Sequence, residues 1–400
     1  MVRKKKEKVE DDQLVLDDIM KATGGQSLAE AGRIPYYIDT GNLSINYKCS
    51  GKFIPGGWPG GRIIESFGPE ASGKSLLGYC FLGNVQRMGG IAIHLDCERS
   101  GNPEFAERCG HVDVNRLITY YPITLEQVEK SVTTVVNAIR KKYKDVPIGI
   151  MWDSIGVCPT ERSWNQIDLP ENPTKQQIKE AGGQERPGER AKAASDMLRR
   201  LNPFLNENNA TIYVVNQLRK KIGVLFGSDE TTEGGGESLK YYASLRIRTS
   251  VPKAFQDSKR KIPIGVNLKV KNKKNRFTTP GLEVENVPLF FNCGIHPTGG
   301  LVESLIKAGR IEGSGTYTVQ EPWAGGEEIK FRAKKTDPLD PEILFKCPAL
   351  VDADSAEDVK EYLAEWQTVM DYLNSGEVEE VGGTDDSDVE HLMGSNPIED

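Results

Sequence analysis

The sequence predicts an α/β fold in which a mainly parallel central sheet is extended by antiparallel strands. Three observations predict it. Between about residues 41 and 215, short apolar runs alternate with segments whose apolar residues recur at helical spacing. Beyond residue 215, strand-like runs follow one another without long helices. A glycine-rich segment at residues 68–75 joins a buried-type strand to a helix. Alternating strands and helices followed by strands alone are typical of this architecture.

The elements of this core follow in chain order. Residues 75–88 carry apolar side chains at helical spacing, and Gly89-Gly90 ends the helix. Residues 125–143 repeat the pattern with Val128 and Val132 on one face. A third helix is expected at residues 191–205. Strands are expected at residues 62–67, 91–95, 148–152, 211–215, 241–249, 264–271 and 284–291.

Composition divides the chain into four predicted segments. Residues 1–40 are charged and then weakly amphipathic, which predicts a short N-terminal helix followed by a linker. Residues 41–298 form the core. Residues 299–374 are interpreted as a small C-terminal α/β domain with a helix near residues 355–373. Residues 375–400 are acidic and poor in apolar side chains, so we expect them to be disordered.

The charge distribution fits a protein that binds nucleic acid. Residues 352–400 carry 16 acidic side chains and one basic side chain, Lys360. Residues 1–351 carry 50 Lys and Arg against 42 Asp and Glu. A basic body with an acidic tail is typical of nucleic-acid binders. From charge alone, a tail that only keeps the protein soluble explains the pattern equally well.

Cysteine usage and hydropathy exclude other classes. The seven cysteines are odd in number and include no CxxC pair, which indicates a reduced cytosolic protein without disulfides or a structural zinc. No apolar run approaches the roughly 20 residues of a membrane helix. The charged N-terminus has no apolar segment after it, so a secretory signal is not expected.

Residues 68–75, GPEASGKS, match the phosphate-binding loop pattern. Glycines let backbone N–H groups point at phosphate oxygens, and the following helix adds partial positive charge at its N-terminus. Lys74 is expected to reach the β and γ phosphates of ATP, and the Ser75 hydroxyl to bind Mg²⁺. The position between a strand and a helix favours a nucleotide site over a glycine-rich turn with a surface lysine. The predicted nucleotide-binding residues of the loop are Gly68, Pro69, Glu70, Ala71, Ser72, Gly73, Lys74 and Ser75.

Two acidic residues follow strands that are expected to end beside this loop. Asp153 ends the apolar run IGIMWD and is predicted to hold the Mg²⁺ shell together with Ser75. Glu98 lies at the end of the strand IAIHLDCE, and ligands of parallel sheets bind outside the carboxyl ends of the strands. Glu98 is therefore placed to polarise the water that attacks the γ-phosphate. The alternative for Glu98 is a helix N-cap or a surface acid.

At this point the sequence resembles the bacterial RecA recombinase family. The resemblance runs from about Ile38 to Leu301. It rests on the approach to the phosphate loop in residues 38–75, on VVNQLRKKIGVLFGSDETTEGGGESLKYYASLRIR, and on KVKNKKN. The second and third segments separate this family from most other phosphate-loop ATPases. The resemblance implies a RecA-type core and an N-terminal segment, residues 1–40, that serves oligomerisation.

The resemblance also implies roles for single residues. Glu98 and Lys74 would be catalytic, and Phe105 would stack on the adenine, with core packing as the alternative. Gln217 would sense the γ-phosphate, because its amide can both donate and accept a hydrogen bond. Lys271 and Lys273 would reach the ATP of the neighbouring subunit, as an arginine finger does in trans. A solvated basic strand is the alternative for these two lysines. Lys240, Tyr241 and Arg246 would lie at the subunit interface or near DNA.

A basic and glycine-rich segment is the predicted DNA-binding loop. Its cations suit phosphate contacts, and its apolar residues suit wedging between the bases of a single strand. The alternative is a surface flap with an internal apolar cluster. The predicted DNA-binding residues are Arg219, Lys220, Lys221, Ile222, Gly223, Phe226, Gly234 and Gly235. The first DNA loop, near residues 161–188, is longer than usual in the family. Its Trp164 and Ile167 are candidates for DNA contact that do not align one to one with family positions.

The resemblance implies an ATP- and Mg²⁺-dependent DNA recombination and repair protein with DNA-dependent ATPase activity. It would form a helical filament on single-stranded DNA, pair it with double-stranded DNA, and take part in the SOS response. Single-strand-binding and loader proteins are implied partners, and the bacterial cytoplasm, or the host cytoplasm for a phage protein, is the implied compartment. The alternatives are a hexameric helicase or translocase on the same fold, which a closed ring would favour, and a regulatory ATPase that does not respond to DNA.

Overall fold

The computed structural model describes residues 15–166, 174, 176–177, 188–220, 230–232, 236–279, 281–376 and 378–382. The chain divides into two compact units, Met1–Pro35 and Tyr36–Asp400. In the first unit, residues 15–23 are helical, at the position of the expected N-terminal helix. Helix α2 (Leu28–Ala31) follows, and the side chain of Ser27 caps it by accepting a hydrogen bond from the backbone N–H of Glu30. Val15, Leu16 and Ile19 are exposed.

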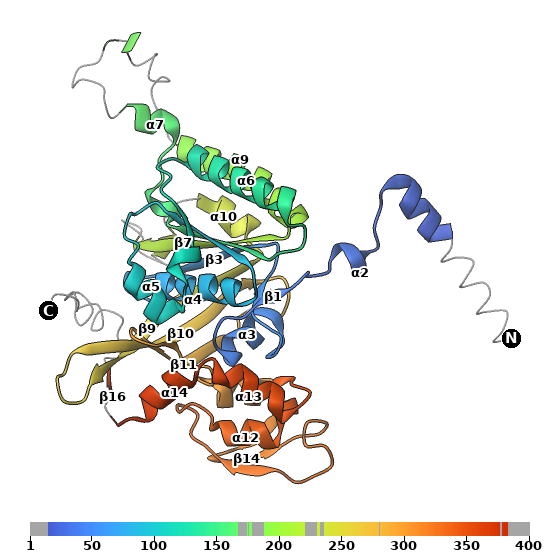
Figure 1. The fold of residues 1–400 in the computed structure, drawn as a ribbon, viewed down its shortest axis with the longest axis vertical. Helices are drawn as coiled ribbons and strands as arrows, with labels where there is room; N and C mark the ends of the chain where they lie inside the picture. Colours follow the sequence, from blue (N-terminus) through green and yellow to red (C-terminus); the bar gives the residue numbers. More distant parts are fainter. Residues whose placement is uncertain are drawn as a thin grey trace. The chain divides into compact units, whose positions relative to one another are not determined.

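A single large sheet forms the centre of the second unit (Figure 1). Along its main path the strands lie in the order β12-β11-β10-β9-β3-β7-β6-β4-β5. Their bounds are β3 (Ile63–Gly68), β4 (Ile91–Asp96), β5 (Ile118–Tyr120), β6 (Ile148–Asp153), β7 (Ala210–Lys220), β9 (Leu245–Asp257), β10 (Pro263–Asn275), β11 (Glu283–Phe290) and β12 (Gly294–Ile295). The six strands from β9 to β5 along this path pair in parallel, whereas β9 to β12 pair antiparallel. The predicted parallel sheet with an antiparallel extension is confirmed.

Short strands add to this framework. β1 (Tyr37–Ile38) and β2 (Trp58–Pro59) form a small antiparallel pair next to α3 (Leu43–Ser50). β8 (Glu230–Thr232) pairs antiparallel with the end of β7. β16 (Val378–Gly382) pairs antiparallel with the far end of β9. Residues 378–382 of the acidic segment therefore form a strand, and residues 383–400 lie outside the described part of the chain.

Helices cover both faces of the sheet. α4 (Lys74–Arg87) and α5 (Pro103–Gly110) pack on one face, and α6 (Leu125–Lys142), α9 (Glu189–Glu207) and α10 (Gly236–Tyr242) on the other. Neighbouring residues of a strand point to opposite faces, so Ile63 joins the core of the α6 layer while Ile64 joins that of the α4 layer. Both faces are thus buried, as expected of parallel strands. Short helical turns complete this part: η1 (Val114–Arg116), η2 (Ile155–Val157) and α7 (Glu161–Asn165).

The C-terminal part has an apolar core of its own. Its elements are α11 (Leu301–Lys307), β13 (Ile311–Ser314), β14 (Thr316–Val319), β15 (Lys330–Arg332), α12 (Pro341–Lys346), η3 (Pro348–Val351), α13 (Ala356–Ala364) and α14 (Gln367–Asn374). Strands β13 to β15 form a separate antiparallel sheet. Leu43 and Phe53 from the α3 region are buried in this core, and Trp366 is buried in the core of the large sheet. The C-terminal part therefore packs against the rest of the unit through shared apolar contacts.

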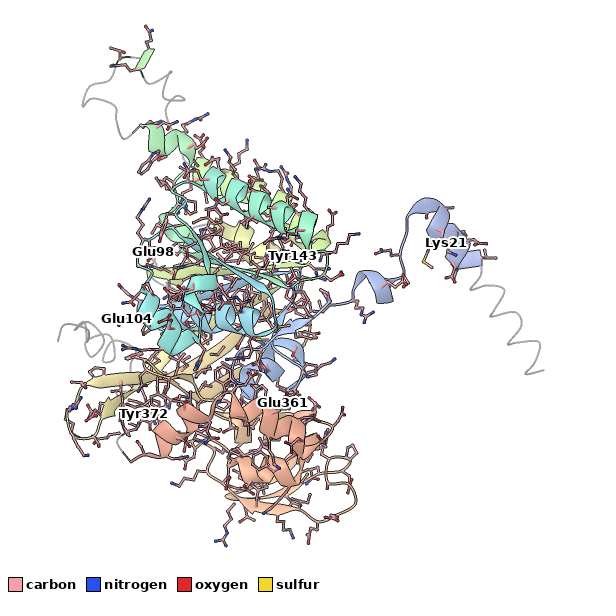
Figure 2. The ribbon with its side chains drawn as sticks, viewed as in Figure 1. Lys21, Glu98, Glu104, Tyr143, Glu361 and Tyr372 are labelled. Carbon is pink, nitrogen blue, oxygen red and sulfur yellow. The ribbon has the colours of Figure 1, made fainter. Side chains whose placement is uncertain are left out.

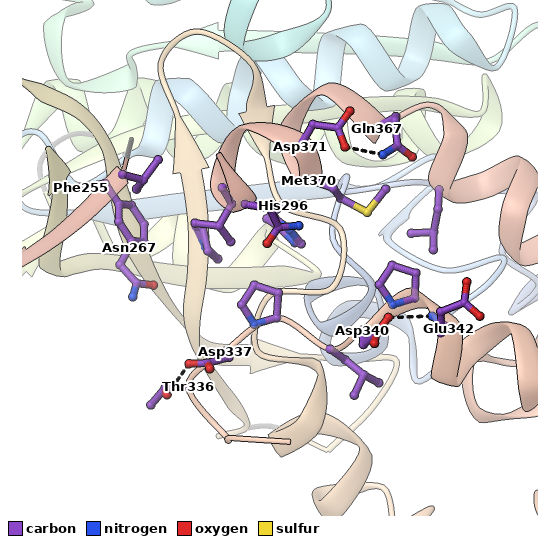
Figure 3. A pocket seen from close by; sticks show the side chains of 18 of the residues that line it. Phe255, Asn267, His296, Thr336, Asp337, Asp340, Glu342, Gln367, Met370 and Asp371 are labelled. Atoms are coloured by element: carbon purple, nitrogen blue, oxygen red, sulfur yellow. Dashed lines mark hydrogen bonds between the residues drawn. The ribbon is translucent and has the colours of Figure 1, made fainter. Parts of the chain in front are cut away.

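A cavity of about 990 Å³ lies between the β9–β10 hairpin and the C-terminal part (Figure 3). Phe255, Asn267 and His296 line it from the side of the large sheet, and Asp340 and Met370 from the C-terminal part. Asp340 is already engaged there, since its carboxylate accepts the backbone N–H of Glu342 at 3.0 Å and caps α12. The lining includes none of the described candidate site residues.

Three expectations on elements need correction. Residues 241–242 end helix α10, so the expected strand 241–249 begins only at Leu245; Leu239 and Ala243, four residues apart, are buried against the helical layer. Residues 219–220 and 230–232 of the predicted DNA-binding loop are strands. The single helix expected near 355–373 is two helices, α13 and α14. Within the described residues we find no helix with the length and apolar content needed to cross a bilayer.

Candidate active site

The phosphate-binding loop connects β3 to α4. β3 ends at Gly68 and α4 begins at Lys74. Gly73 has a φ of +80°, and a Cβ added there would lie 2.6 Å from Cδ2 of Leu268. A left-handed backbone conformation with a close neighbour favours glycine. The turn that aims the N-terminus of α4 into the loop therefore depends on Gly73.

Polar side chains of the loop fold back onto its own backbone. The Ser72 hydroxyl donates to the carbonyl of Pro69 at 2.8 Å and lies 3.0 Å from the Thr249 hydroxyl of β9. The Lys74 ammonium also donates to the Pro69 carbonyl. Lys74 is 7% exposed, so a buried cation stands at the start of a helix. Glu70 and Ala71 are exposed at the tip of the loop. A buried ammonium beside free helical N–H groups is a site for a phosphate anion.

A cluster of carboxylates lies next to the loop, at the carboxyl ends of β4 and β6. The two strands are parallel neighbours in which Asp96 is opposite Asp153. The Ser75 hydroxyl donates to Oδ2 of Asp153 at 2.7 Å. The Ser154 hydroxyl donates to Oε1 of Glu98, which is half-buried and is labelled in Figure 2. The predicted residues Ser75, Asp153 and Glu98 are thus brought together.

Electrostatics of this cluster favour a bound cation. Burial, together with the negative charges of Glu98 and Asp96, raises the pKa of Asp153 to about 6, against the opposing effects of the Ser75 hydrogen bond and Lys74. Hydroxyl and carboxylate oxygens are the ligands that Mg²⁺ prefers, and Mg²⁺ is usually held by one or two carboxylates and by substrate phosphates. In the described part of the chain no group of three His, Cys, Asp or Glu forms a ready-made metal cage. Ser75 and Asp153 beside an anion-binding loop fit Mg²⁺ bound together with a nucleotide.

Gln217 and Phe105 belong to elements outside the loop. Gln217 on β7 is opposite Gly68 on β3, so it flanks the start of the phosphate loop. Phe105 is on α5, half-buried, with its ring centroid 6.2 Å from those of Tyr79 and Phe291. The structure thus gives Phe105 packing contacts, and stacking on a base remains a prediction.

Lys271 and Lys273 lie on β10, on the antiparallel side of the sheet. Nζ of Lys271 is 3.0 Å from Oε2 of Glu283 on β11. This contact, with help from Lys269, lowers the pKa of Glu283. Lys273 is exposed. Within this subunit Lys271 is therefore paired with Glu283 and is not brought to the phosphate loop.

The predicted DNA-binding residues fall mostly outside the described part. Arg219 and Lys220 have described backbone at the end of β7, where they pair with Thr231 and Glu230. The remaining predicted residues of this loop, Lys221, Ile222, Gly223, Phe226, Gly234 and Gly235, lie outside the described residues, as does Ile167.

The two ends of the first predicted DNA loop are joined. Arg162 on α7 forms an ion pair with Glu189 on α9 at 2.5 Å. Arg190 donates to the carbonyls of Ile155 and Cys158, both at 2.9 Å. Trp164 is 40% exposed on α7. The chain between α7 and α9 therefore leaves and re-enters the core at one place, directly after the strand that carries Asp153.

The sequence did not predict the contacts of three residues in this region. Ser154, directly after β6, orients Glu98, which follows the neighbouring strand β4, and Glu283 pairs with Lys271 from β11; strand order and register would have found both. Arg246, expected at an interface or near DNA, is 9% exposed and donates to the fully buried Glu65, because β9 pairs with β3 at this position. By contrast, Tyr241 is 70% exposed, and Lys240 pairs with Glu237.

Comparison with known proteins identifies the relatives of this chain. The family model of the RecA N-terminal domain matches residues 13–155 and 171–296, well over half of the sequence. The chain belongs to the RecA family. The family match is interrupted at residues 156–170, where the first predicted DNA loop begins.

Individual relatives can be aligned with this chain over most of their length. Protein RecA of Rhizobium etli is 34% identical over 296 residues, 73% of this chain and 74% of that protein. Protein RecA of Brucella anthropi is 33% identical over 323 residues, 79% of this chain and 81% of that protein. As a RecA-family member, the chain acts in ATP-dependent DNA recombination and repair. It is a DNA-dependent ATPase that uses ATP with Mg²⁺, binds DNA and forms filaments. The helicase alternative is not favoured.

Proposed function

We propose that Ser75, Asp153 and Glu98 are the centre of ATP hydrolysis in this chain. The observation that carries this proposal is the 2.7 Å hydrogen bond from Ser75 to Asp153, next to the Ser154-bound Glu98. Ser75 and Asp153 would hold Mg²⁺, which supplies charge neutralisation of the phosphates. Lys74 and the backbone N–H groups of the other loop residues from Gly68 to Gly73, apart from Pro69, would hold the phosphates themselves.

Glu98 would act as general base on the attacking water. Ser154 donates to one carboxylate oxygen and leaves the other free to accept a proton. A hydrogen-bonded carboxylate has one defined orientation, so the water would be held in line with the γ-phosphate. Gln217, beside Gly68 in the sheet, would report the presence of that phosphate to the strand β7 and the loop that follows it.

Hydrolysis would be completed across a subunit interface. Lys271 and Lys273 of one subunit would stabilise charge on the γ-phosphate held by its neighbour. ATP hydrolysis would then require the filament. Phe105 would contact the adenine from α5.

The DNA would be held by the segments that follow β6 and β7. Arg219, Lys220 and Lys221 would contact phosphates, and Ile222 and Phe226 would separate bases, with Gly223, Gly234 and Gly235 permitting the loop to adapt. Both segments leave strands that carry nucleotide-site residues, Asp153 and Gln217. This shared origin supports coupling between ATP state and DNA affinity.

The remaining proposals concern organisation and partners. We divide the chain into an oligomerisation segment (1–40), the ATPase core (41–298), a small C-terminal domain (299–374) and an acidic tail (375–400). Single-strand-binding and loader proteins are proposed as partners, and the cytoplasm as the compartment.

Joint-molecule formation tests the proposal. Labelled single-stranded DNA, homologous supercoiled duplex, ATP and Mg²⁺ should give joints with the wild type and none with Lys74→Ala. Glu98→Gln should bind ATP and form joints, yet hydrolyse ATP at least about 100-fold more slowly, the lower range for a lost general base. Normal hydrolysis by Glu98→Gln would contradict the assignment of Glu98. Hydrolysis without joints in the wild type would favour translocation instead.

A further inference from the structure

Four oppositely charged residues alternate across β10 and β11, and we call them the charge ladder: Lys269, Lys271, Glu283 and Glu285. Lys269 pairs with Glu285, and its Nζ also lies 3.8 Å from Oε2 of Glu283. Lys271 lies directly opposite Glu283 in the antiparallel register, with Nζ 3.0 Å from the same Oε2. Glu283 is therefore shared by two lysines.

The two lysines proposed to act in trans are not equivalent. Lys273 is two residues beyond Lys271, past the start of β11 at Glu283. The chain facing it is a turn in which the Gly281 N–H donates to the carbonyl of Asn272. Lys273 is exposed, and among the described residues no acid lies within ion-pair distance of it. Only Lys271 must leave a carboxylate before it can reach a phosphate.

The geometry allows this exchange. The side chains of Lys271 and Glu283 are 41% and 29% exposed, so the pair lies at the protein surface, with Oε2 of Glu283 itself covered. Exposed pairs of this kind shift an equilibrium by up to about five-fold. A terminal phosphate carries more negative charge than a carboxylate and competes for the same ammonium group. Lys269, already 3.8 Å from Glu283, would keep that carboxylate compensated after Lys271 has left.

We propose that Glu283 is a positioning residue that holds Lys271 in the free subunit and releases it to the neighbouring subunit's γ-phosphate, while Lys269 takes over the compensation of Glu283. The inference rests on the proposed trans role of Lys271. The charge ladder then helps to set the ATP concentration at which Lys271 engages the neighbouring subunit. Loss of Glu283 lowers that concentration, and loss of Lys269 raises it.

Three variants test the inference through the ATP concentration at half-maximal, single-strand-stimulated hydrolysis. Glu283→Gln should lower this concentration about two- to five-fold with an unchanged maximal rate. Lys269→Gln should raise it by a similar factor. Glu365→Gln is the matched control, since Glu365 pairs with Arg87, outside the charge ladder, at 2.9 Å with similar exposure of 43% and 27%. It should leave the concentration unchanged.

Binding of a fluorescent ATP analogue without DNA separates the proposed role from a structural one, because no neighbour contributes there. All three variants should bind it as the wild type does. In a Lys271→Ala background, Glu283→Gln should have no further effect. A lower maximal rate for Glu283→Gln, or shifts of the same sign for Glu283→Gln and Lys269→Gln, would overturn the inference. Normal hydrolysis by Lys271→Ala would instead overturn the proposed trans role on which it rests.

Discussion

At the residue scale, Asp153 shows how a buried carboxylate that is placed to bind a cation lowers the free energy of unfolding when no cation is bound. The side chain is 6% exposed and has Glu98 and Asp96 as neighbours. Burial and these charges raise its pKa from 3.8 to about 6 in the absence of nucleotide. The folded chain thus binds a proton at Asp153 more tightly than the unfolded chain does. Its ionisation therefore lowers the free energy of unfolding as pH rises from about 4 to about 6, and the loss stays constant above that.

Asp153→Asn should accordingly stabilise the nucleotide-free protein at pH 7.5, by roughly 2–3 kcal/mol. An asparagine oxygen can still accept the Ser75 hydroxyl, while the charge that burial disfavours is gone. Urea unfolding at pH 7.5 and at pH 4 measures this, and the gain should disappear at the lower pH. The variant should also lose the stabilisation that Mg²⁺ and ATP give the wild type. If the variant is less stable than the wild type at pH 7.5 without nucleotide, the ionised Asp153 side chain does not destabilise the folded protein.

The residues of the candidate site differ in how far the sequence could reveal them. Gly68 to Ser75 form one contiguous motif, Asp153 ends an apolar strand and Glu98 closely follows another, so these signals are local. Ser154 and Glu283 depend on which strands are neighbours and in what register. A one-residue change in register would move a side chain to the opposite face. Pairwise contacts of this kind follow from tertiary structure alone.

At the scale of elements, a buried ion pair links the strand before the phosphate loop to the antiparallel extension. Arg246 on β9 donates to Glu65 on β3, and Asn216 on β7 donates to the other oxygen of Glu65 at 2.9 Å. Glu65 is fully buried, and the Arg246 guanidinium lies 4.6 Å from the centroid of the Phe67 ring. Three adjacent strands therefore meet at one carboxylate directly below the loop.

Removing one partner of this pair should be costly. Arg246→Met keeps most of the aliphatic stem but leaves Glu65 buried without its cation, for which we expect a loss of about 3–5 kcal/mol in the free energy of unfolding. The double variant Glu65→Gln with Arg246→Met should be clearly more stable than the single Arg246→Met. Denaturant unfolding of the wild type, both single variants and the double variant measures this coupling. Additive effects would indicate that the two charges do not depend on each other.

The elements themselves were predictable where they are long and periodic. α6, with Val128, Val132 and Val136 buried on one face, begins at the expected residue and ends one residue earlier than expected. The short strands β13 to β15 have three or four residues each, too few to show a period. Tyr241 and Tyr242 favour a strand by type, but burial of Leu239 and Ala243 against the helical layer makes this segment a helix. Tertiary contacts override local preference in such short segments.

At the scale of the whole molecule, the acidic end of the chain is attached to a basic part of the sheet. β16 lies along β9, and its acids form two ion pairs, Glu380 with Lys253 at 2.9 Å and Glu379 with Lys261. Residues 383–400 follow and add six acidic side chains and no basic one. The acidic end is thus in a position to compete with DNA phosphates for the cations of the hairpin.

Deleting residues 376–400 should therefore speed the binding of duplex DNA, because it removes nine acids and uncovers Lys253 and Lys261. The effect should be strong near 0.01 M salt, where the screening length is about 30 Å, and weak at 0.15 M, where it is about 8 Å. Deleting residues 383–400 alone keeps β16 and its ion pairs in place. If general repulsion by the tail dominates, this shorter deletion should give most of the gain. If the ion pairs of β16 dominate, only the longer deletion should do so. Stopped-flow binding of a labelled duplex measures both, and rates unchanged by either deletion would exclude competition between the acidic end and DNA.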